Sequence, residues 1–221
     1  MKDRMKLQRI LAAVLLSAIA LAGYLEEVLF RDTFQPLVDV FPAFITNWDI
    51  PIFISINSGL ANTYVGWAFN ILTRLGSTIF MLTICVALYS VRRRRESLII
   101  FWSIIVGTLL TLPLKLAVPR PRPSMILPST VLFDREPGSS FPSGHSMRIF
   151  AFASVGSRLW PRLTIPLHVL ALLVAFSRIY MGQHFPSDVI AGTAIGLVAG
   201  YLTTKYQNQL LRMLSHIGLT A

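Results

Sequence analysis

The sequence predicts an all-α integral membrane protein, a bundle of six transmembrane helices with short interfacial helices in the first external loop. Of the 221 residues, 54% are hydrophobic and 14% are charged, whereas soluble domains carry roughly 25% charged residues. The apolar residues also gather in runs, and a spanning helix needs about 17–25 mostly apolar residues. The six runs are approximately Ile10–Tyr24, Val65–Val91, Leu98–Val118, Ser143–Val155, Leu163–Ser177 and Val189–Thr204.

The first run has an alternative interpretation, because it follows Lys2, Arg4 and Lys6 as the apolar part of a signal peptide does. No clean small-x-small cleavage site precedes Glu26, so we favour a retained helix. The fourth and fifth runs are short for a span, and their helices must tilt or extend into their flanks. The chain shows no repeat, and we expect residues 1–221 to form a single membrane-embedded domain.

The positive charge is distributed as the predicted topology requires. The net charge is +10, and basic residues gather at four places that fall on one membrane face. The positive-inside rule identifies that face as cytoplasmic. We therefore expect a multi-pass protein of the cell (inner) membrane with both termini in the cytoplasm, and we give little weight to a nucleic-acid partner. The basic segments are Lys2–Arg9, Arg92–Arg95, Arg158–Arg162 and Lys205–Arg212.

The opposite face begins with segment 25–64, which is acidic and too long for a plain turn. The apolar residues between Phe34 and Ile45 suit an amphipathic stretch on the bilayer surface, and Ile50–Leu60 forms a second short apolar piece. We expect interfacial helices here. Two roles stay open for them, which are packing over the bundle and guiding substrate entry.

Three cations stand out on this acidic face. Lys115 lies near the end of the third run, and Arg120 and Arg122 follow in a segment whose alternating prolines exclude a helix. Lysine can snorkel to the interface, and arginine can meet lipid phosphates, so each has a simple explanation. Three cations within eight residues nevertheless oppose the positive-inside rule. This favours a function, and a bound phosphate would supply the balancing charge.

A second feature of this face is the stretch Phe141–Ser146. Ser143 and Gly144 stand where the next helix starts, and His145 falls in its first turn. A helix N-terminus presents unpaired N–H groups and binds anions. Arg148 follows on the same helix face as His145. Taken alone, a capped helix with an incidental histidine is the simpler explanation.

The third feature is Arg178, followed by His184 and Asp188 where the sixth run begins. The spacing can bring the carboxylate to one side of the imidazole, which fixes the tautomer and raises the basicity of the other nitrogen. A histidine next to a helix-capping aspartate is the alternative. Two histidines and a carboxylate also match a zinc site, but the surrounding cations would repel the metal. Cys85, the single cysteine, offers no disulfide and no thiolate site.

Together these groups have the chemistry of phosphoryl transfer through a phosphohistidine. One histidine attacks phosphorus and the other protonates the leaving oxygen. The cations and the N–H groups of helix ends stabilise charge on the phosphoryl oxygens.

The motifs resemble the three signatures of the type-2 phosphatidic acid phosphatase (PAP2) superfamily, across roughly residues 65–205. The pattern Lys115, six residues, then Arg122-Pro123 is similar to the first signature, and Pro142-Ser-Gly-His145 is similar to the second. Ser177-Arg178, five residues, His184, three residues, Asp188 is similar to the third. Jointly these motifs are highly specific. The resemblance implies a six-helix enzyme that uses no metal and no other cofactor.

The resemblance also implies a role for each matched residue. His184 would be the nucleophile, Asp188 its orienting partner and His145 the general acid. Arg120 and Arg148 lie outside the signatures, and we expect one of them to contact a second anionic group of the substrate. The groups expected to hold the phosphate are Lys115, Arg122, Ser143, the Gly144 amide and Arg178.

We therefore predict an integral-membrane lipid phosphatase whose site faces the periplasmic or external side. Its partners would be the bilayer and a phosphorylated membrane lipid, such as a polyprenyl diphosphate, phosphatidylglycerophosphate or a lipid A phosphate. A phosphotransferase that passes the phosphate to a second lipid is the nearest alternative, and a non-enzymatic lipid or anion transporter is the next. Soluble haloperoxidases share this site around vanadate, but six spans make that interpretation remote. The sequence predicts no oligomeric state.

Overall fold

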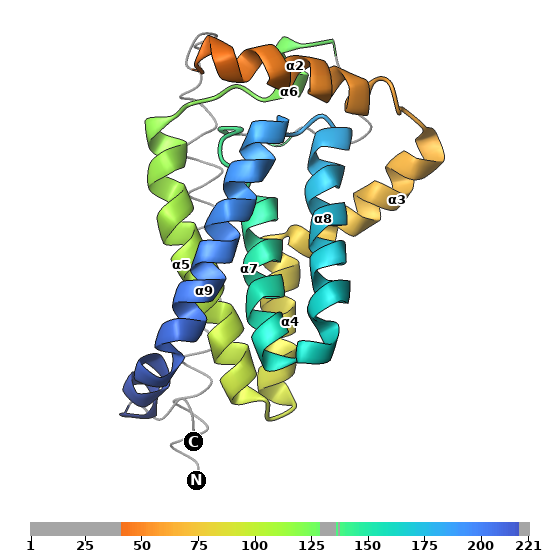
Figure 1. The fold of residues 1–221 in the computed structure, drawn as a ribbon. Coiled ribbons are helices and arrows are strands. Elements are labelled where there is room, and N and C mark those ends of the chain that lie inside the picture. Colours follow the sequence, from red (N-terminus) through yellow and green to blue (C-terminus); the bar gives the residue numbers. More distant parts are fainter. Residues whose placement is uncertain (1–40, 129–135, 137, 217–221) are drawn as a thin grey trace.

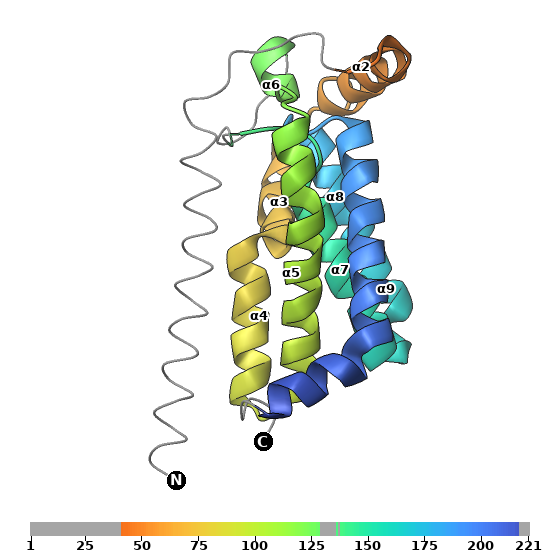
Figure 2. The ribbon, with the colours of Figure 1, turned by 90° about the vertical axis from the view of Figure 1, so that its left-hand side faces the viewer.

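The computed structural model describes residues 41–128, 136 and 138–216, and this part of the chain is helical (Figure 1). The first predicted span, Ile10–Tyr24, lies outside the described residues. The four longest helices of the described part run along the long axis of the bundle, as both views show (Figure 2). They are α5 (Arg94–Ala117), α7 (Gly144–Leu159), α8 (Thr164–Tyr180) and α9 (Pro186–His216). Each overlaps one of the predicted runs, which confirms a helix at each of these places, while the count of six spans stays a prediction.

The helix α7 forms the centre of the bundle, since most of its residues are buried. Three glycines of α9 at four-residue spacing let the backbone of α9 approach α7 closely. A Cβ at Gly192 would collide with the carbonyl oxygen of Ser143, and one at Gly196 would collide with that of Met147. Such stripes of small residues are typical of close helix pairs in membranes. The stripe brings the first turns of the two helices together, and the Ser143 amide donates to the Asp188 carbonyl at 3.0 Å.

The second predicted span, Val65–Val91, is not one continuous helix. The helix α3 (Thr63–Thr73) is followed by the 3-10 turn η1 (Arg74–Gly76) and by α4 (Thr78–Ser90), and the two helical parts are bent by 56°. Ser77 caps α4, because its side chain accepts a hydrogen bond from the Phe80 amide at 3.2 Å. The apolar run is interrupted at this break by the stretch Thr73-Arg-Leu-Gly-Ser-Thr78. Gly76 and Ser77 in this stretch are the local sequence signal for the bend.

The helix α2 (Ala43–Asn57) lies across the end of the bundle (Figure 1). Its buried residues are Asp49, Phe53 and Asn57, at four-residue spacing along one face. Phe44 on the outer side is 73% exposed. A helix within segment 25–64 is therefore confirmed, although it begins seven residues before the expected piece Ile50–Leu60 and its external location stays a prediction. Its place on the bilayer surface stays a prediction.

Two helices of the described part are long and apolar enough to cross a membrane, namely Arg94–Ala117 and Pro161–Tyr180, which includes the turn η2 (Pro161–Leu163) ahead of α8. The bent pair of α3 and α4 raises the number to three if it counts as one span. The short helix α6 (Pro123–Ile126) completes the described elements.

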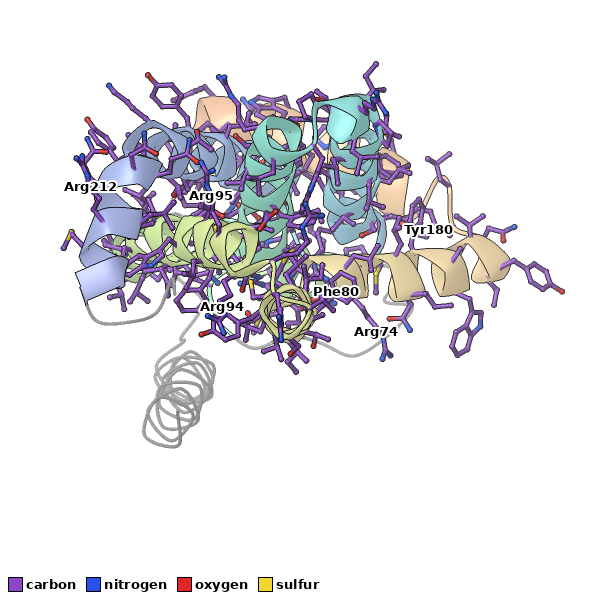
Figure 3. All side chains as sticks on the ribbon, turned by 90° about the horizontal axis from the view of Figure 1, so that it is seen from below. Arg74, Phe80, Arg94, Arg95, Tyr180 and Arg212 are labelled. Carbon is purple, nitrogen blue, oxygen red and sulfur yellow. The ribbon has the colours of Figure 1, made fainter. Side chains whose placement is uncertain are left out.

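The end of the bundle opposite α2 is basic. Figure 3, seen from that end, shows Arg94, Arg95 and Arg212 there. An open cavity of about 590 Å³ is lined by Arg95, Asn208, Leu211 and Arg212. This is the end that the charge pattern assigns to the cytoplasm.

Candidate active site

The predicted site residues gather at the end of the bundle beneath α2. They come from the segment that leaves α5, the segment that enters α7, the first turn of α7, the end of α8 and the start of α9. The close contact of α7 with α9 explains why residues about forty positions apart in sequence meet here.

The imidazole of His184 is held by the backbone. Its Nδ1 lies 2.7 Å from the carbonyl oxygen of Ser140, so Nδ1–H donates to that carbonyl. Asp188 Oδ2, the expected orienting group, lies further away, 3.7 Å from Nδ1. A donating Nδ1 leaves a lone pair on Nε2. The structure thus presents Nε2 for chemistry and identifies Ser140 as the direct partner of His184.

Asp188 is fully buried and hydrogen-bonded on both oxygens. Oδ2 accepts from the Phe185 amide at 2.8 Å and from the Ser140 hydroxyl. Oδ1 lies 2.7 Å from Nη1 of Arg120. Ser140 therefore touches both members of the His184–Asp188 pair, through its carbonyl and through its hydroxyl.

Arg122 and Arg178 converge on one carboxylate, that of Glu136. Arg178 Nη2 lies 2.6 Å from Oε1, and Arg122 Nη1 lies 3.3 Å from Oε2. Arg122 Nη1 also lies 3.3 Å from Nε2 of His184. On its other side, Arg178 donates from Nη1 to the Thr73 hydroxyl at 2.9 Å. An anionic group thus lies between the two arginines, and Arg122 Nη1 is close to both this carboxylate and His184 Nε2.

The pKa of Glu136 indicates that the region between Arg122 and Arg178 is strongly positive. Burial alone would raise the pKa of Glu136, but the positive charges of Arg178 and Arg122 outweigh it and hold that pKa well below its usual value. The site therefore favours an anion strongly enough to keep a half-buried carboxylate ionised.

His184 itself is neutral at ordinary pH. Burial is the main cause that lowers its pKa, to about 4. Arg122 and Arg178 lower it further, and Asp188 opposes the shift. A neutral imidazole is the form that can attack phosphorus.

The start of α7 behaves as a capped helix N-terminus. The Ser143 side chain accepts hydrogen bonds from the Ser146 amide at 3.4 Å and from the Ser146 hydroxyl at 3.1 Å. Ser143 therefore has the capping role that was its simpler explanation. Gly144 is the first residue of the helix, and His145 is half-buried beside Gly76, where a Cβ would lie 3.1 Å from the imidazole Cδ2.

The remaining predicted residues are buried near this end. Lys115 lies in the last turn of α5. Arg148 donates from Nε to the carbonyl of Gly76 at 2.9 Å, and its Nη1 lies 3.2 Å from the position of a Cβ on Gly144. Its guanidinium thus stands beside the N-terminus of its own helix.

Arg120 was one of two residues, with Arg148, of which one was expected to contact a second anionic group of the substrate. Its guanidinium instead contacts two buried carboxylates, those of Asp49 and Asp188.

Sequence reasoning missed four residues of this cluster. Glu136 belongs to a charged loop, and this was its only signal. Ser140 acts partly through its carbonyl, which side-chain patterns do not reveal. Asp49 and Thr73 come from α2 and α3, whose placement over the site depends on tertiary packing.

A family model described as the PAP2 superfamily matches residues 96–212, more than half of the chain. The chain belongs to the PAP2 superfamily. The matched region contains every site residue that the sequence predicted, whereas Asp49 and Thr73 precede it.

Relatives and a solved structure agree with this membership. Lipid A 1-phosphatase of Rhizobium johnstonii is 36% identical over 110 residues, 47% of this chain and 45% of that protein. The chain thus matches less than half of that relative's length. Phosphatidylglycerophosphatase B of Bacillus subtilis is 29% identical over 156 residues, 64% of this chain and 74% of that protein. The crystal structure of Aquifex aeolicus LpxE has a TM-score of 0.67 and 28% identity, covering 78% of this chain and 100% of that one.

Proposed function

We propose that this PAP2 protein is a lipid phosphatase that hydrolyses a phosphate ester of a membrane lipid through a phosphohistidine. The observation that supports it best is the anion position between Arg122 and Arg178, occupied by the Glu136 carboxylate. The lone pair of His184 Nε2 lies beside this position, 3.3 Å from Arg122 Nη1.

In the first step, Nε2 of His184 attacks phosphorus and the bond to the lipid oxygen breaks. Arg122, Arg178, Lys115 and the α7 N-terminus stabilise the charge on the equatorial oxygens. His145 donates a proton to the leaving oxygen, so that a lipid monophosphate releases the lipid alcohol and a lipid diphosphate releases the lipid monophosphate.

In the second step, water attacks the phosphohistidine. His145 accepts the water proton, inorganic phosphate leaves, and both histidines return to their starting state. Ser140 and Asp188 hold the Nδ1 side of the nucleophile throughout, so that the imidazolium-like intermediate stays hydrogen-bonded.

A metal ion does not fit the reacting nitrogen. A guanidinium lies 3.3 Å from Nε2 of His184, and a second one lies across the anion position. A divalent cation there would be repelled by both. The arginines supply the positive charge that a metal provides in other phosphatases.

The placement in the membrane follows from the charge pattern. The described helices would form five of six spans, counting the bent α3–α4 pair as one, and the basic end would face the cytoplasm. The site, at the other end, then faces the periplasmic or external side of the inner membrane, beneath α2. This orientation suits lipids whose phosphate is exposed on that side.

The substrate class follows from the chemistry that two relatives' names share. One name specifies lipid A, and the other specifies phosphatidylglycerophosphate. In both, a phosphate ester is carried at the head of a membrane lipid. We propose such a lipid phosphate as the substrate, with polyprenyl diphosphate included because the anion position can accept a terminal phosphate of either kind.

The test is phosphate release by the purified full-length chain against a panel of lipid monophosphates and diphosphates. We expect metal-independent release that His184→Ala abolishes. His168→Ala is the matched control, because His168 lies on α8 and contacts Thr164, and it should keep wild-type turnover. Transfer of phosphate to a second lipid instead of water would indicate a phosphotransferase. Full turnover in His184→Ala, or no turnover in the wild type, would reject the proposal.

A further inference from the structure

We propose that Asp49 of α2, together with Arg120, is a positioning residue of the phosphatase site. The two residues hold Asp188 and Ser140, and through them they hold His184. The inference rests on the phosphatase function proposed above. It adds a residue from outside the matched region 96–212, and it makes the helix across the end of the bundle part of the catalytic apparatus.

Asp49 is 0% exposed, although α2 lies at the end of the molecule (Figure 1). A buried carboxylate is strongly unfavourable unless it is paired and hydrogen-bonded. Both oxygens of Asp49 have partners. Oδ2 lies 2.7 Å from Arg120 Nη2, and Oδ1 accepts from the Ser187 amide at 2.9 Å. The Ser187 hydroxyl also donates to Oδ2.

Arg120 connects Asp49 to Asp188. One terminal nitrogen, Nη2, binds Asp49, and the other, Nη1, lies 2.7 Å from Asp188 Oδ1. The rings of Phe41 and Phe185 lie 3.8 and 4.0 Å from the guanidinium carbon, within cation–π range. A guanidinium enclosed in this way cannot reach substrate without breaking both ion pairs. Positioning therefore replaces substrate selectivity as its role.

The bridge formed by Asp49, Arg120 and Asp188 determines the orientation of the Asp188 carboxylate. Because Arg120 engages Oδ1, the other oxygen faces the Ser140 hydroxyl, the Phe185 amide and the imidazole of His184. Rotation of the carboxylate would break the ion pair to Arg120. The ion pair to Arg120 thus keeps Oδ2 of Asp188 directed toward Ser140 and His184.

Arg120 also acts through its backbone. Its carbonyl accepts a hydrogen bond from the Ser140 amide at 2.8 Å. Ser140 in turn accepts from His184 Nδ1 through its own carbonyl. A single residue, Arg120, therefore places both groups that contact the Nδ1 side of His184, and Asp49 holds the side chain of Arg120 from α2.

The charge of Asp49 matters as well as its shape. Arg120 shares one positive charge between two buried carboxylates. Without the Asp49 charge, the guanidinium would pair with Asp188 alone, free to shift toward it, and the first turn of α9 would lose an anion at its N-terminal end. Misplacement of a reacting group by about 1 Å can lower turnover about 100-fold. The phosphate-binding Arg122 and Arg178 lie outside this bridge, so the substrate KM should change little.

The first experiment compares Asp49→Asn with Asn57→Ala in the purified full-length chain. Asn57 is the matched control, since it is equally buried in α2 and ties it to the bundle through the Tyr180 carbonyl at 2.8 Å. We expect Asp49→Asn to lower kcat about 10- to 100-fold with KM within about twofold, and Asn57→Ala to keep kcat within about threefold. Equal losses in both variants would mean that Asp49 only docks α2, and would overturn the inference.

The second experiment is a double-mutant cycle with Asp188→Asn. If Asp49 acts through Asp188, Asp49→Asn should lower kcat in the wild-type background and have little further effect in the Asp188→Asn background. Losses that multiply would overturn the inference. Arg120→Lys keeps a buried charge but cannot bridge two carboxylates. If Asp49→Asn does not fold, Arg120→Lys takes its place in the double-mutant cycle with Asp188→Asn. His184→Ala separates the two proposals, because an active His184→Ala rejects the mechanism, whereas an inactive one with a fully active Asp49→Asn rejects only this inference.

Discussion

Nη2 of Arg178 lies 2.6 Å from Oε1 of Glu136. This ion pair joins the end of α8 to the segment that precedes α7, and it places a carboxylate where the proposed reaction requires a phosphate. The Glu136 side chain is 36% exposed, so it can move away from Arg178 without opening the helix bundle. Glu136 therefore competes with any anion that enters the site.

Glu136→Gln should strengthen anion binding, because it removes the negative charge that Arg122 and Arg178 now hold. A partly exposed ion pair contributes up to about 1 kcal/mol, which corresponds to roughly a fivefold effect. We expect the inhibition constant of inorganic phosphate to fall by up to about fivefold, as measured by competition at fixed pH. Unchanged or weaker inhibition would contradict competition by this carboxylate.

The histidine variants should separate the two chemical steps. His184→Ala removes the nucleophile and should abolish turnover and labelling of the protein by a phosphate-labelled substrate. His145→Ala removes the proton donor and should lower turnover about 100- to 10,000-fold. Labelling should persist in His145→Ala with substrates whose leaving group needs no proton. Acid-quench labelling of both variants checks this, and a labelled His184→Ala would assign the nucleophile to another residue.

The pH dependence should show the low pKa of His184. The nucleophile must be neutral, and its pKa lies near 4 rather than at its usual 6.5. The kcat/KM of the free enzyme should therefore stay high as pH falls through 6.5 and be lost only as pH falls through about 4. An acidic limb at pH 6 to 7 would contradict a neutral, buried nucleophile.

Gly192→Ala should destabilise the protein and misplace the site together. The added Cβ would meet the carbonyl oxygen of Ser143, which lies next to the α7 N-terminus. Overpacking of this kind lowers stability by about 1–3 kcal/mol. Ala194→Val, on the exposed side of the same helix, is the control and should unfold at the wild-type temperature. Thermal unfolding in detergent checks both, and an equally stable Gly192→Ala would show that the two helices can separate slightly without loss.

Much of the fold was predictable because the signals are local. Runs of apolar residues predict α5, α7, α8 and α9, and Ser143 predicts where α7 begins. The bend in the second predicted span was not predicted, because Arg74, Gly76 and Ser77 were treated as single interruptions of one apolar run, although together they mark the break. The extent of α2 was also missed, since the residues that tie it to the bundle are a buried aspartate and asparagine, Asp49 and Asn57.

The candidate site was also predictable from the sequence only in part. Motif spacing identified Arg122, Arg178, His184 and Asp188 as one cluster, and these residues do lie together, while their catalytic roles stay predictions. Spacing did not show that the Ser140 carbonyl, rather than Asp188, contacts Nδ1 of His184 directly. A backbone carbonyl carries no residue-specific signal, so only the path of the chain reveals it.

By itself, the sequence determined that this is a helical membrane protein that carries the three PAP2 signature motifs, because hydropathy and motif spacing are properties of short segments. The tertiary structure alone decided which groups surround His184 and what Arg120 does. Arg120 contacts Asp188 and Asp49 at sequence separations of 68 and 71 residues. Such contacts depend on how closely α9 packs against α7 and on where α2 crosses the bundle, and no local pattern encodes either.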